Sequence, residues 1–397
     1  MTVASHAGAM PRRHAAIEQA GLLALFGVAG ALQFSIAIAQ ILLTVALICW
    51  IALIVVDRES IEIPSFFWPL VVYAVVTCIS TAFSPDPRTS LLACKQMVLF
   101  LIVPLVYRFV RGSHAQTMVT VIISFAAAAA AVGIFQFGVL HYDNLGQRPQ
   151  GTLGHYMTYS GLLMLVIGTA VARILFGERD RLWAALVVPA IAVVIPLTFS
   201  RNAEVGACAA VALLLLLKDK RLLAILPVVA LVFFAVAPAR VTNRVESIFN
   251  LKDPTNHDRL VMVKEGVHMV KDHPVLGIGP NMVQPLYAQY REPDADNVVN
   301  PHLHNVPLQI AAERGLPALA VWLWFIVALT VALAKMLRDK SQRLLAATGL
   351  AAVVAMLAAG MFEYNFGDSE FLMLFLVIVT LPFAAARSKH ASFGHPS

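Results

Sequence analysis

The sequence predicts an all-α fold, that of a polytopic integral membrane protein. Of its 397 residues, 59% are hydrophobic and only 13% are charged, and the mean hydropathy is +0.77. Soluble domains carry about 25% charged residues, so most of this surface must face lipid. The apolar residues also come in runs of about 17 to 25, the length of a membrane-spanning helix.

About twelve such runs follow one another along the chain. The first two runs are separated only by "QFS" and the seventh and eighth only by "SRN". At either place, the number of spans could differ by one. The polar, basic segment before the first run does not resemble a cleavable signal peptide. The expected spans lie near residues 17–33, 36–56, 63–83, 88–107, 115–140, 157–176, 182–200, 202–217, 221–239, 316–335, 343–362 and 370–386.

These runs divide the chain into three parts. Residues 1–239 form a nine-helix N-terminal bundle, residues 240–315 a hydrophilic loop, and residues 316–397 a three-helix segment. Basic residues gather in alternate loops, as the positive-inside rule requires of cytoplasmic loops. We therefore predict that both termini are cytoplasmic. The long loop, "HYDNLGQRPQGTLGH" and "EYNFGDSE" are expected on the far side of the membrane.

Composition and motifs also argue against several classes of function. The net charge of +6 is accounted for by cytoplasmic loops, so we predict no nucleic-acid partner. The four cysteines lie inside apolar runs without the paired spacing of a thiolate metal site. No "GxxxxGK" phosphate loop is present. Because nucleotides are not available outside the cytoplasm, any group transferred there must arrive already activated.

Basic residues on the far side stand out against the positive-inside pattern. Arg201 lies in "TFSRNAEVG" at the outer end of the seventh span, although an interfacial arginine can also reach lipid headgroups. Arg259 begins an amphipathic helix that Asn256 is expected to cap, and a surface charge is the competing interpretation. Arg88 and Arg148 lie in other far-side segments.

Two further features suit anionic ligands. Lys95 lies within the fourth span, where an ionisable residue is a functional candidate, although a lysine can also extend to the interface. The segment "HPVLGIGPN" has glycines at 277 and 279 and two prolines, which predicts a tight turn with exposed backbone amides. Such a turn either cradles an anion or only redirects the chain.

The segment "NPHLHNVPLQIAAERGLP", residues 300–317, places polar residues directly before an apolar span. Pro307 suits the first turn of a helix, and the following Arg-Gly-x-Pro ends it, which predicts a short helix over 307–314. His304 precedes its positive N-terminal end, where a neutral imidazole is favoured over an imidazolium. A neutral imidazole is the form that a general base requires.

Two other interpretations of these histidines stay open. His302 and His304 could be ordinary loop residues, or a His-x-His pair that binds metal, although no third ligand stands at useful spacing. We expect His302 to point away from the side that His304 faces.

Several segments together resemble the O-antigen ligase and polymerase superfamily, whose members handle polyprenyl-diphosphate-linked glycans. "LHNVPLQIAAERGLPAL" resembles its His-Asn motif, "SRNAEVG" its Ser-Arg segment, and "RPQGTLGHYMTYSGLLM" its Arg-x-x-Gly-Thr turn. "RLVMVKEGVHMVKDHPVLGIGPN" resembles its arginine-led helix that ends in Pro-x-x-Gly-x-Gly. The resemblance covers about residues 148–330.

The resemblance implies an O-antigen ligase in the bacterial inner membrane. Such an enzyme moves polymeric O-antigen from undecaprenyl diphosphate to a sugar hydroxyl of lipid A-core, with inversion, on the periplasmic side. It implies no metal, nucleotide or other cofactor. The implied partners are undecaprenyl-diphosphate-linked O-antigen, lipid A-core and membrane lipids, with no nucleic acid.

The resemblance also suggests roles for residues. His304 matches the general base, and Asn305 would orient it or the glycan. Arg201 and Arg259 would hold the diphosphate, because a guanidinium binds phosphate oxygens in a planar, bidentate manner. Glu363 is a candidate to orient the histidine or to contact the acceptor. The other candidate substrate-binding residues are Asp368, Arg148, Lys95, Arg88, Gly277 and Gly279.

Three alternatives share parts of this pattern. An O-antigen polymerase would use the same donor but a lipid-linked acceptor, and a protein O-oligosaccharyltransferase would glycosylate a secreted protein. A transporter is the non-enzyme alternative. It would place polar residues near the bilayer midplane on broken, inverted-repeat helices, whereas here the polar cluster lies in a far-side loop.

Overall fold

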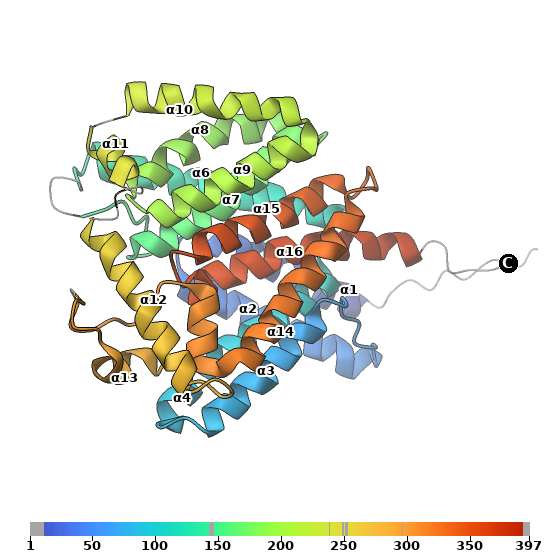
Figure 1. Ribbon diagram of the computed structural model, residues 1–397. Coiled ribbons are helices and arrows are strands. Elements are labelled where there is room, and N and C mark those ends of the chain that lie inside the picture. Colours follow the sequence, from blue (N-terminus) through green and yellow to red (C-terminus); the bar gives the residue numbers. More distant parts are fainter. Residues whose placement is uncertain are drawn as a thin grey trace, which may run out of the picture.

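The computed structural model describes residues 12–142, 147–237, 239–247, 250, 253–295 and 297–391, and within these ranges every regular element is a helix (Figure 1). The α-helices are α1 (Arg12–Ala31), α2 (Ile36–Asp57), α3 (Phe67–Ala82), α4 (Pro87–Cys94), α5 (Ile102–Phe109), α6 (Ser113–Gly138), α7 (Tyr156–Phe176), α8 (Arg181–Leu197), α9 (Arg201–Lys218), α10 (Ile225–Val236), α11 (Ala239–Glu246), α12 (Pro254–Asp272), α13 (Val283–Tyr290), α14 (Val306–Met336), α15 (Arg343–Gly360) and α16 (Ser369–Ala391). Short 3-10 helices are η1 (Lys95–Leu101), η2 (Lys220–Ala224) and η4 (Asn365–Gly367).

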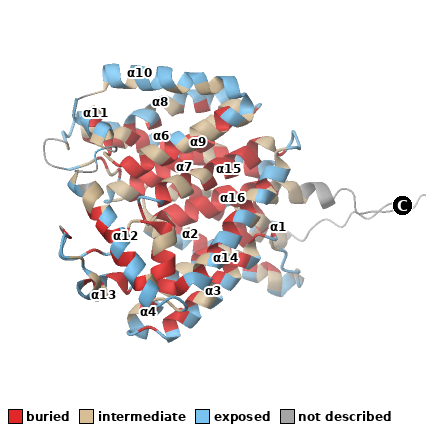
Figure 2. Cartoon of the chain, in the orientation of Figure 1, coloured by how far each residue is buried: buried red, intermediate tan, exposed pale blue. Residues whose placement is uncertain are grey.

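The centre of the molecule is a bundle of α7, α9, α15 and α16, and most residues of α7, α15 and α16 are buried (Figure 2). Small residues allow these helices to pack closely. A Cβ at Gly168 would be 3.4 Å from the Cβ of Ala351, and one at Gly206 would meet the Ala355 carbonyl oxygen at 2.9 Å. Small residues at helix contacts are typical of membrane bundles, in which lipid tails supply no hydrophobic drive between helices.

The outer helices expose apolar side chains, as a lipid-facing surface requires. The exposed large side chains include Ile41 and Ile48 on α2 and Val75 on α3, and none of α10 is buried. Eight of the described helices are long and apolar enough to cross a membrane. The expected all-α, polytopic membrane fold is confirmed.

The count of twelve spans stays a prediction. The runs near 63–83 and 182–200 form the shorter apolar helices α3 and α8. The run near 202–217 forms α9, which begins with Arg201 and ends with Lys218. The run near 221–239 divides into η2 and the 12-residue α10, which is about 18 Å long and shorter than a hydrocarbon core of about 30 Å.

The hydrophilic loop forms a layer of its own on one side of the molecule. There, α11, α12 and α13 lie together, opposite the end of α16 (Figure 1). A small second core joins α12 and α13 to the start of α14, through Met262, Met269, Val283, Leu303 and Ala312. This loop layer is therefore packed on the chain segment that contains the two histidines.

The predicted short helix before the tenth span is confirmed. The helical residues of α14 divide at Gly315, whose φ of 80° and ψ of 170° are not helical, so residues 306–314 form a separate first segment. A Cβ at position 315 would stand 2.1 Å from the carbonyl oxygen of Val275. Glycine is therefore required both for the backbone conformation and for the close contact.

Candidate functional site

The segment around His304 is fixed on both sides by buried neighbours. Leu303 is buried in the second core, and its N–H donates to the side-chain oxygen of Gln309 at 2.7 Å. Asn305 is the N-cap of α14 and accepts a hydrogen bond from the N–H of Leu308 at 2.9 Å. Between them, His304 adopts a left-handed conformation with φ 47°. This conformation costs roughly 1 kcal/mol or more for a non-glycine residue, and such strain occurs most often at functional sites.

His304 forms a hydrogen bond with Glu363, from the turn between α15 and α16. The distance from Nδ1 to Oε2 is 2.9 Å, and Glu363 is 9% exposed. Because an ionised carboxylate can only accept, Nδ1 must carry the proton. In the neutral ring, Nε2 then keeps its lone pair, which is the arrangement of a general base oriented by a carboxylate.

The environment keeps the Glu363 carboxylate ionised. Burial on its own raises the pKa of Glu363, but the hydrogen bond from His304 and the nearby His302 outweigh it and lower the pKa below its ordinary value. The N–H of Tyr364 also donates to Oε1 at 2.9 Å. Glu363 is therefore held as a charged acceptor with a fixed orientation.

His302 does not point away from His304, and that expectation is wrong. The two ring centroids are 4.2 Å apart, and Nε2 of His302 is 3.7 Å from Oε1 of Glu363. Positions two residues apart in an extended segment lie on the same face, and here both rings face the carboxylate of Glu363. Burial and the neighbouring His304 lower the pKa of His302, which favours its neutral form.

The fold also supplies the third ligand that the sequence appeared to lack. One ligand atom each from His302, His304 and Glu363 lie within 4.8 Å of one another. Two imidazoles and a carboxylate are a ligand set that zinc accepts. The local spacing of the histidines could not indicate this group, because Glu363 is 59 residues further along the chain than His304.

Asn305 connects the two halves of the site. Its side-chain oxygen caps α14, and its side-chain nitrogen donates to the carbonyl oxygen of Met361 at 3.1 Å. Met361 lies two residues before Glu363, so this bond ties the histidine segment to the carboxylate segment. The structure thus gives Asn305 a positioning role through the backbone, rather than a contact with the His304 ring.

A second polar group lies at the start of α7. Asp368 accepts a hydrogen bond from the hydroxyl of Thr158 and caps α16 through the N–H of Phe371. His155 caps α7, and its ring nitrogen accepts a hydrogen bond from the N–H of Thr158. Arg148 stacks over the ring of Tyr156, with 4.4 Å from its Cζ to the centroid. The sequence did not indicate His155 and Thr158 as neighbours of this site.

Arg201 is buried at the N-terminus of α9 and is 4% exposed. Its guanidinium donates to the backbone and side-chain oxygens of Ser247 and lies 3.3 Å from the carboxylate of Asp253. Asp253 directly precedes α12, so Arg201 ties α9 to the beginning of that helix. The helix begins at Pro254, and the expectation that Asn256 would cap it is wrong, because Asn256 lies in the first turn and donates to Ser247 and Asn250.

Arg259 shares a face of α12 with the residues that contact the histidine segment. Positions 259, 262, 266 and 269 follow helical spacing, Met262 and Met269 are buried, and Gly266 lies against Leu303 and Leu308. Arg259 is half-buried and stands seven residues before Gly266, about 10 Å along the axis. The fold therefore brings Arg201 and Arg259 to the same end of α12.

The glycine turn packs against the end of the short helix. The N–H groups of Gly277 and Gly279 donate to the carbonyls of His273 and Glu313 at 3.0 and 2.9 Å. A Cβ at Gly277, where φ is 69°, would lie 2.2 Å from the carbonyl carbon of Glu313. These two amides are thus used within the protein, and the structure supplies a packing role for both glycines.

Arg88 and Lys95 are exposed, the first in α4 and the second where α4 passes into η1. The Ser90 hydroxyl between them donates to the carbonyl of Pro280 at 2.8 Å. This bond places α4 beside the glycine turn, on the loop side of the molecule (Figure 1).

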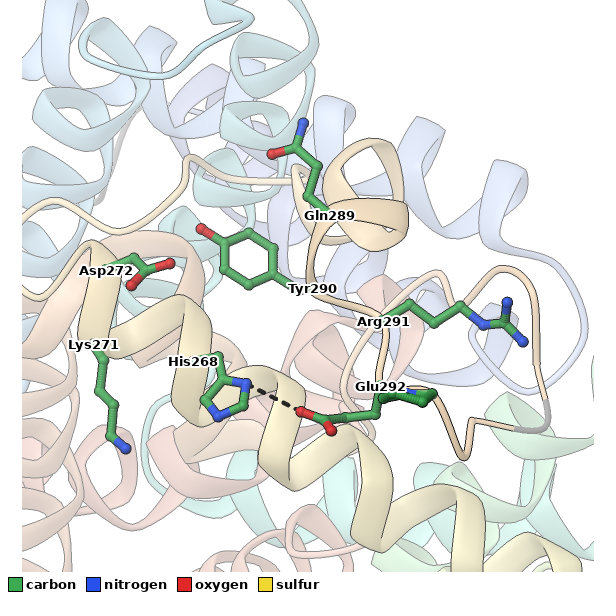
Figure 3. Close-up of a pocket in the computed structure, with 8 residues that line it drawn as sticks. His268, Lys271, Asp272, Gln289, Tyr290, Arg291 and Glu292 are labelled. Carbon is green, nitrogen blue, oxygen red and sulfur yellow. Dashed lines mark ion pairs between the residues drawn. The ribbon is translucent and has the colours of Figure 1, made fainter.

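Two pockets adjoin this part of the structure. A polar pocket of about 340 Å³ lies between the end of α12 and the segment after α13, and His268 pairs with Glu292 across it at 3.1 Å (Figure 3). Its lining residues are His268, Lys271, Asp272, Gln289, Tyr290, Arg291, Glu292 and Pro293. An apolar pocket of about 370 Å³ lies between α14 and α15, and it includes Val306, Pro307 and Met361.

Fold and site together define a helical membrane protein with a histidine–carboxylate pair in the loop segments between its helices. Residues 184–323 match the family described as O-antigen ligase, so this region of the chain is similar to that family. The matched region includes Arg201, Arg259, His304 and Asn305, whereas Glu363 lies beyond it. No match was found among curated proteins.

Proposed function

We propose that this protein is an O-antigen ligase that transfers polymeric O-antigen from undecaprenyl diphosphate to a sugar hydroxyl of lipid A-core. The observation that carries the proposal is the His304–Glu363 hydrogen bond, formed on the His-Asn motif within the matched family region. The matched family supports an O-antigen ligase or polymerase type of activity in general. The particular donor, acceptor and stereochemistry are part of the proposal.

In the proposed reaction, the acceptor hydroxyl attacks the anomeric carbon on the face opposite the diphosphate. The new bond joins the acceptor oxygen to that carbon, and the bond from the carbon to the diphosphate oxygen breaks. Nε2 of His304 takes the hydroxyl proton, and Glu363 stabilises the imidazolium that forms. Undecaprenyl diphosphate leaves with the bonding electrons, so the step requires neither metal nor nucleotide.

Positive charge at the beginning of α12 suits the leaving diphosphate. We propose that Arg259 contacts the phosphate oxygens and that Arg201 contributes to the same field while holding the segment before α12. A guanidinium offers a planar pair of donors, whereas an ammonium is a point charge. The apolar pocket beside Val306 and Pro307 has the chemistry to accommodate part of the isoprenoid chain.

The substitutions Arg201→Lys and Arg259→Lys should each remove most of the activity even though they keep the charge. For Arg201, the reason includes the loss of its simultaneous bonds to Ser247 and Asp253. Transfer should be measured at matched amounts of folded protein in the membrane. Near-normal rates for both variants would exclude these side chains from the diphosphate site.

We place the site on the periplasmic face of the bacterial inner membrane, with a nine-helix bundle over 1–239, the loop over 240–315 and three helices over 316–397. The positive-inside pattern supports this orientation. It is consistent with the position of α11, α12 and α13 on the side opposite the end of α16 (Figure 1).

The direct test is transfer by the purified protein from undecaprenyl-diphosphate glycan, with chelator present and nucleotide absent. Three acceptors should be compared: lipid A-core, a lipid-linked repeat unit, and a secreted protein substrate. Product on lipid A-core alone supports the ligase. Product on the lipid-linked repeat indicates an O-antigen polymerase, and product on the protein indicates a protein O-oligosaccharyltransferase.

The lipopolysaccharide pattern of a deletion strain tests the same question in the cell. A ligase deletion should remove the whole ladder while lipid-linked polymer is retained. A pattern of core plus one repeat would instead indicate a polymerase. An unchanged ladder would contradict both assignments.

A further inference from the structure

We propose that His302, His304 and Glu363 form a binding site for a divalent transition cation such as Zn²⁺, and that the bound cation inhibits the enzyme. The zinc site itself depends only on the structure, whereas the inhibition rests on the proposed function. Two imidazole nitrogens and one carboxylate oxygen lie within 4.8 Å of one another. This leaves a fourth coordination position for water.

The ligand spacing fits a small cation after modest side-chain adjustment. In a tetrahedral zinc site with bonds of about 2.0–2.2 Å, neighbouring ligand atoms are roughly 3.3–3.6 Å apart. In the structure, Oε2 of Glu363 is 2.9 Å from His304 Nδ1, and Oε1 is 3.7 Å from His302 Nε2. These two distances lie close to that range on either side.

The three side chains are also of the chemical types that zinc binds. A zinc ligand must be a neutral imidazole or an ionised carboxylate. Both histidine rings face the Glu363 carboxylate, which the N–H of Tyr364 holds in place at 2.9 Å.

Inhibition follows from the nitrogen that the cation would use. Without metal, Nδ1 of His304 carries the ring proton and donates it to Glu363, so Nε2 can accept a proton from the acceptor hydroxyl. A cation on Nδ1 requires a lone pair there, so the proton of the neutral ring moves to Nε2 through solvent. Nε2 then becomes a donor and can no longer act as the base.

His302 is the residue that distinguishes the two functions of this cluster. In the proposed transfer, His304 and Glu363 suffice. In the metal site, His302 supplies one of the three protein ligands. The exposed His268 of α12, which pairs with Glu292 from the segment after α13, offers a matched control outside the cluster (Figure 3).

The test uses the full-length purified protein in detergent or nanodiscs. Zinc binding should be measured by titration calorimetry, and Co²⁺ should be added to give the visible spectrum of a tetrahedral site with nitrogen and oxygen ligands. We expect one tight Zn²⁺ per chain that is lost or weakened in His302→Gln and unchanged in His268→Gln. Loss of a direct ligand should weaken binding at least as much as the roughly 10- to 100-fold typical of outer-shell changes.

Transfer activity should then be followed against zinc concentration, each variant relative to its own zinc-free rate. The inhibitory concentration should rise about tenfold or more in His302→Gln, stay unchanged in His268→Gln, and chelator should restore the wild-type rate. Absence of stoichiometric binding, or inhibition that His302→Gln leaves unaltered, would overturn the proposal. If no transfer is found with any acceptor, calorimetry and the Co²⁺ spectrum still decide whether the site exists.

Discussion

At the scale of single residues, the central feature is a histidine whose two ring nitrogens have different tasks. Nδ1 is occupied by the bond to Glu363, and in the proposed reaction Nε2 is the proton acceptor. The adjacent Asn305 does not contact the ring but fixes the backbone on which both partners stand. Substitutions at these positions should therefore separate an effect on chemistry from an effect on position.

We predict that Glu363→Gln lowers kcat by about 10²-fold or more, the lower range for loss of acid–base catalysis. An amide has almost the same shape, but it cannot stabilise the imidazolium and can orient the ring in the wrong tautomer. Glu363→Asp keeps the charge on a shorter side chain and should retain more activity than Glu363→Gln. Equal rates for wild type and Glu363→Gln would show that the carboxylate does not assist His304.

We predict that Asn305→Asp and Asn305→Ala differ in a defined way. Aspartate can still cap α14 through the N–H of Leu308, but it cannot donate to the Met361 carbonyl. Alanine loses both bonds and should lower the free energy of unfolding by about 1 kcal/mol from the cap alone. Both variants should lose transfer activity, whereas only Asn305→Ala should show a clearly lower unfolding temperature. Full activity in Asn305→Asp would remove the bond to Met361 from the positioning of the site.

At the scale of elements, the short helix over 306–314 and the turn over 273–279 form one unit. Their backbones exchange hydrogen bonds, from Ile278 to Ala312 and from Gly279 to Glu313. The hydroxyl of Ser80, on α3, donates to the carbonyls of Leu276 and Glu313. This unit holds the start of α14 against the loop layer, and with it the segment that contains His304.

Gly315→Ala should test that unit. The new Cβ would stand 2.1 Å from the Val275 carbonyl oxygen at a φ of 80°, so the variant should be destabilised by about 2 kcal/mol or more. Gly138→Ala is the control, because a Cβ there meets nothing within 4 Å. Thermal unfolding in detergent should show a lower midpoint for Gly315→Ala alone. An equal midpoint in both variants would contradict the close contact.

Helices were predictable from the sequence where the hydrophobic runs were long. They were less predictable where contacts with distant residues decide where a helix begins. The break at Gly315 was predictable, since Arg-Gly-x-Pro is a helix end whatever packs on it. The start of α12 was not, because Asp253 pairs with Arg201 and α12 begins at Pro254. The contact of both histidines with Glu363 could not be predicted from local spacing, because the carboxylate comes from the distant turn between α15 and α16.

At the scale of the whole molecule, the site is assembled from distant parts of the chain. The candidate arginines and His304 lie within the matched family region, and their motifs could be recognised in the sequence. Glu363 could be assigned to the same side of the membrane, but its contact with His304 required the packing of α14 beside α15 and the Asn305–Met361 bond. Topology can be predicted by counting charges, whereas contacts between helices depend on three-dimensional packing.

The predicted topology can be tested with reporter fusions at Asn281 and Ser397. The first should report the periplasm and the second the cytoplasm. An odd number of expected spans lies between the two positions, and the positive-inside pattern places the C-terminus in the cytoplasm. Matched fusions in the basic loop after Lys218 should agree with the fusion at Ser397. Reporters at Asn281 and Ser397 in the same compartment would contradict the orientation and the periplasmic position of the site.

The late position of Glu363 has a consequence for biosynthesis. A ribosome makes the histidine segment well before the turn that carries its carboxylate, and the two meet only when α15 has been inserted and the chain has turned back. Until then, the growing polypeptide holds His304 without the partner that fixes its tautomer. Under the proposed function, a chain that ends before Glu363 should therefore lack transfer activity.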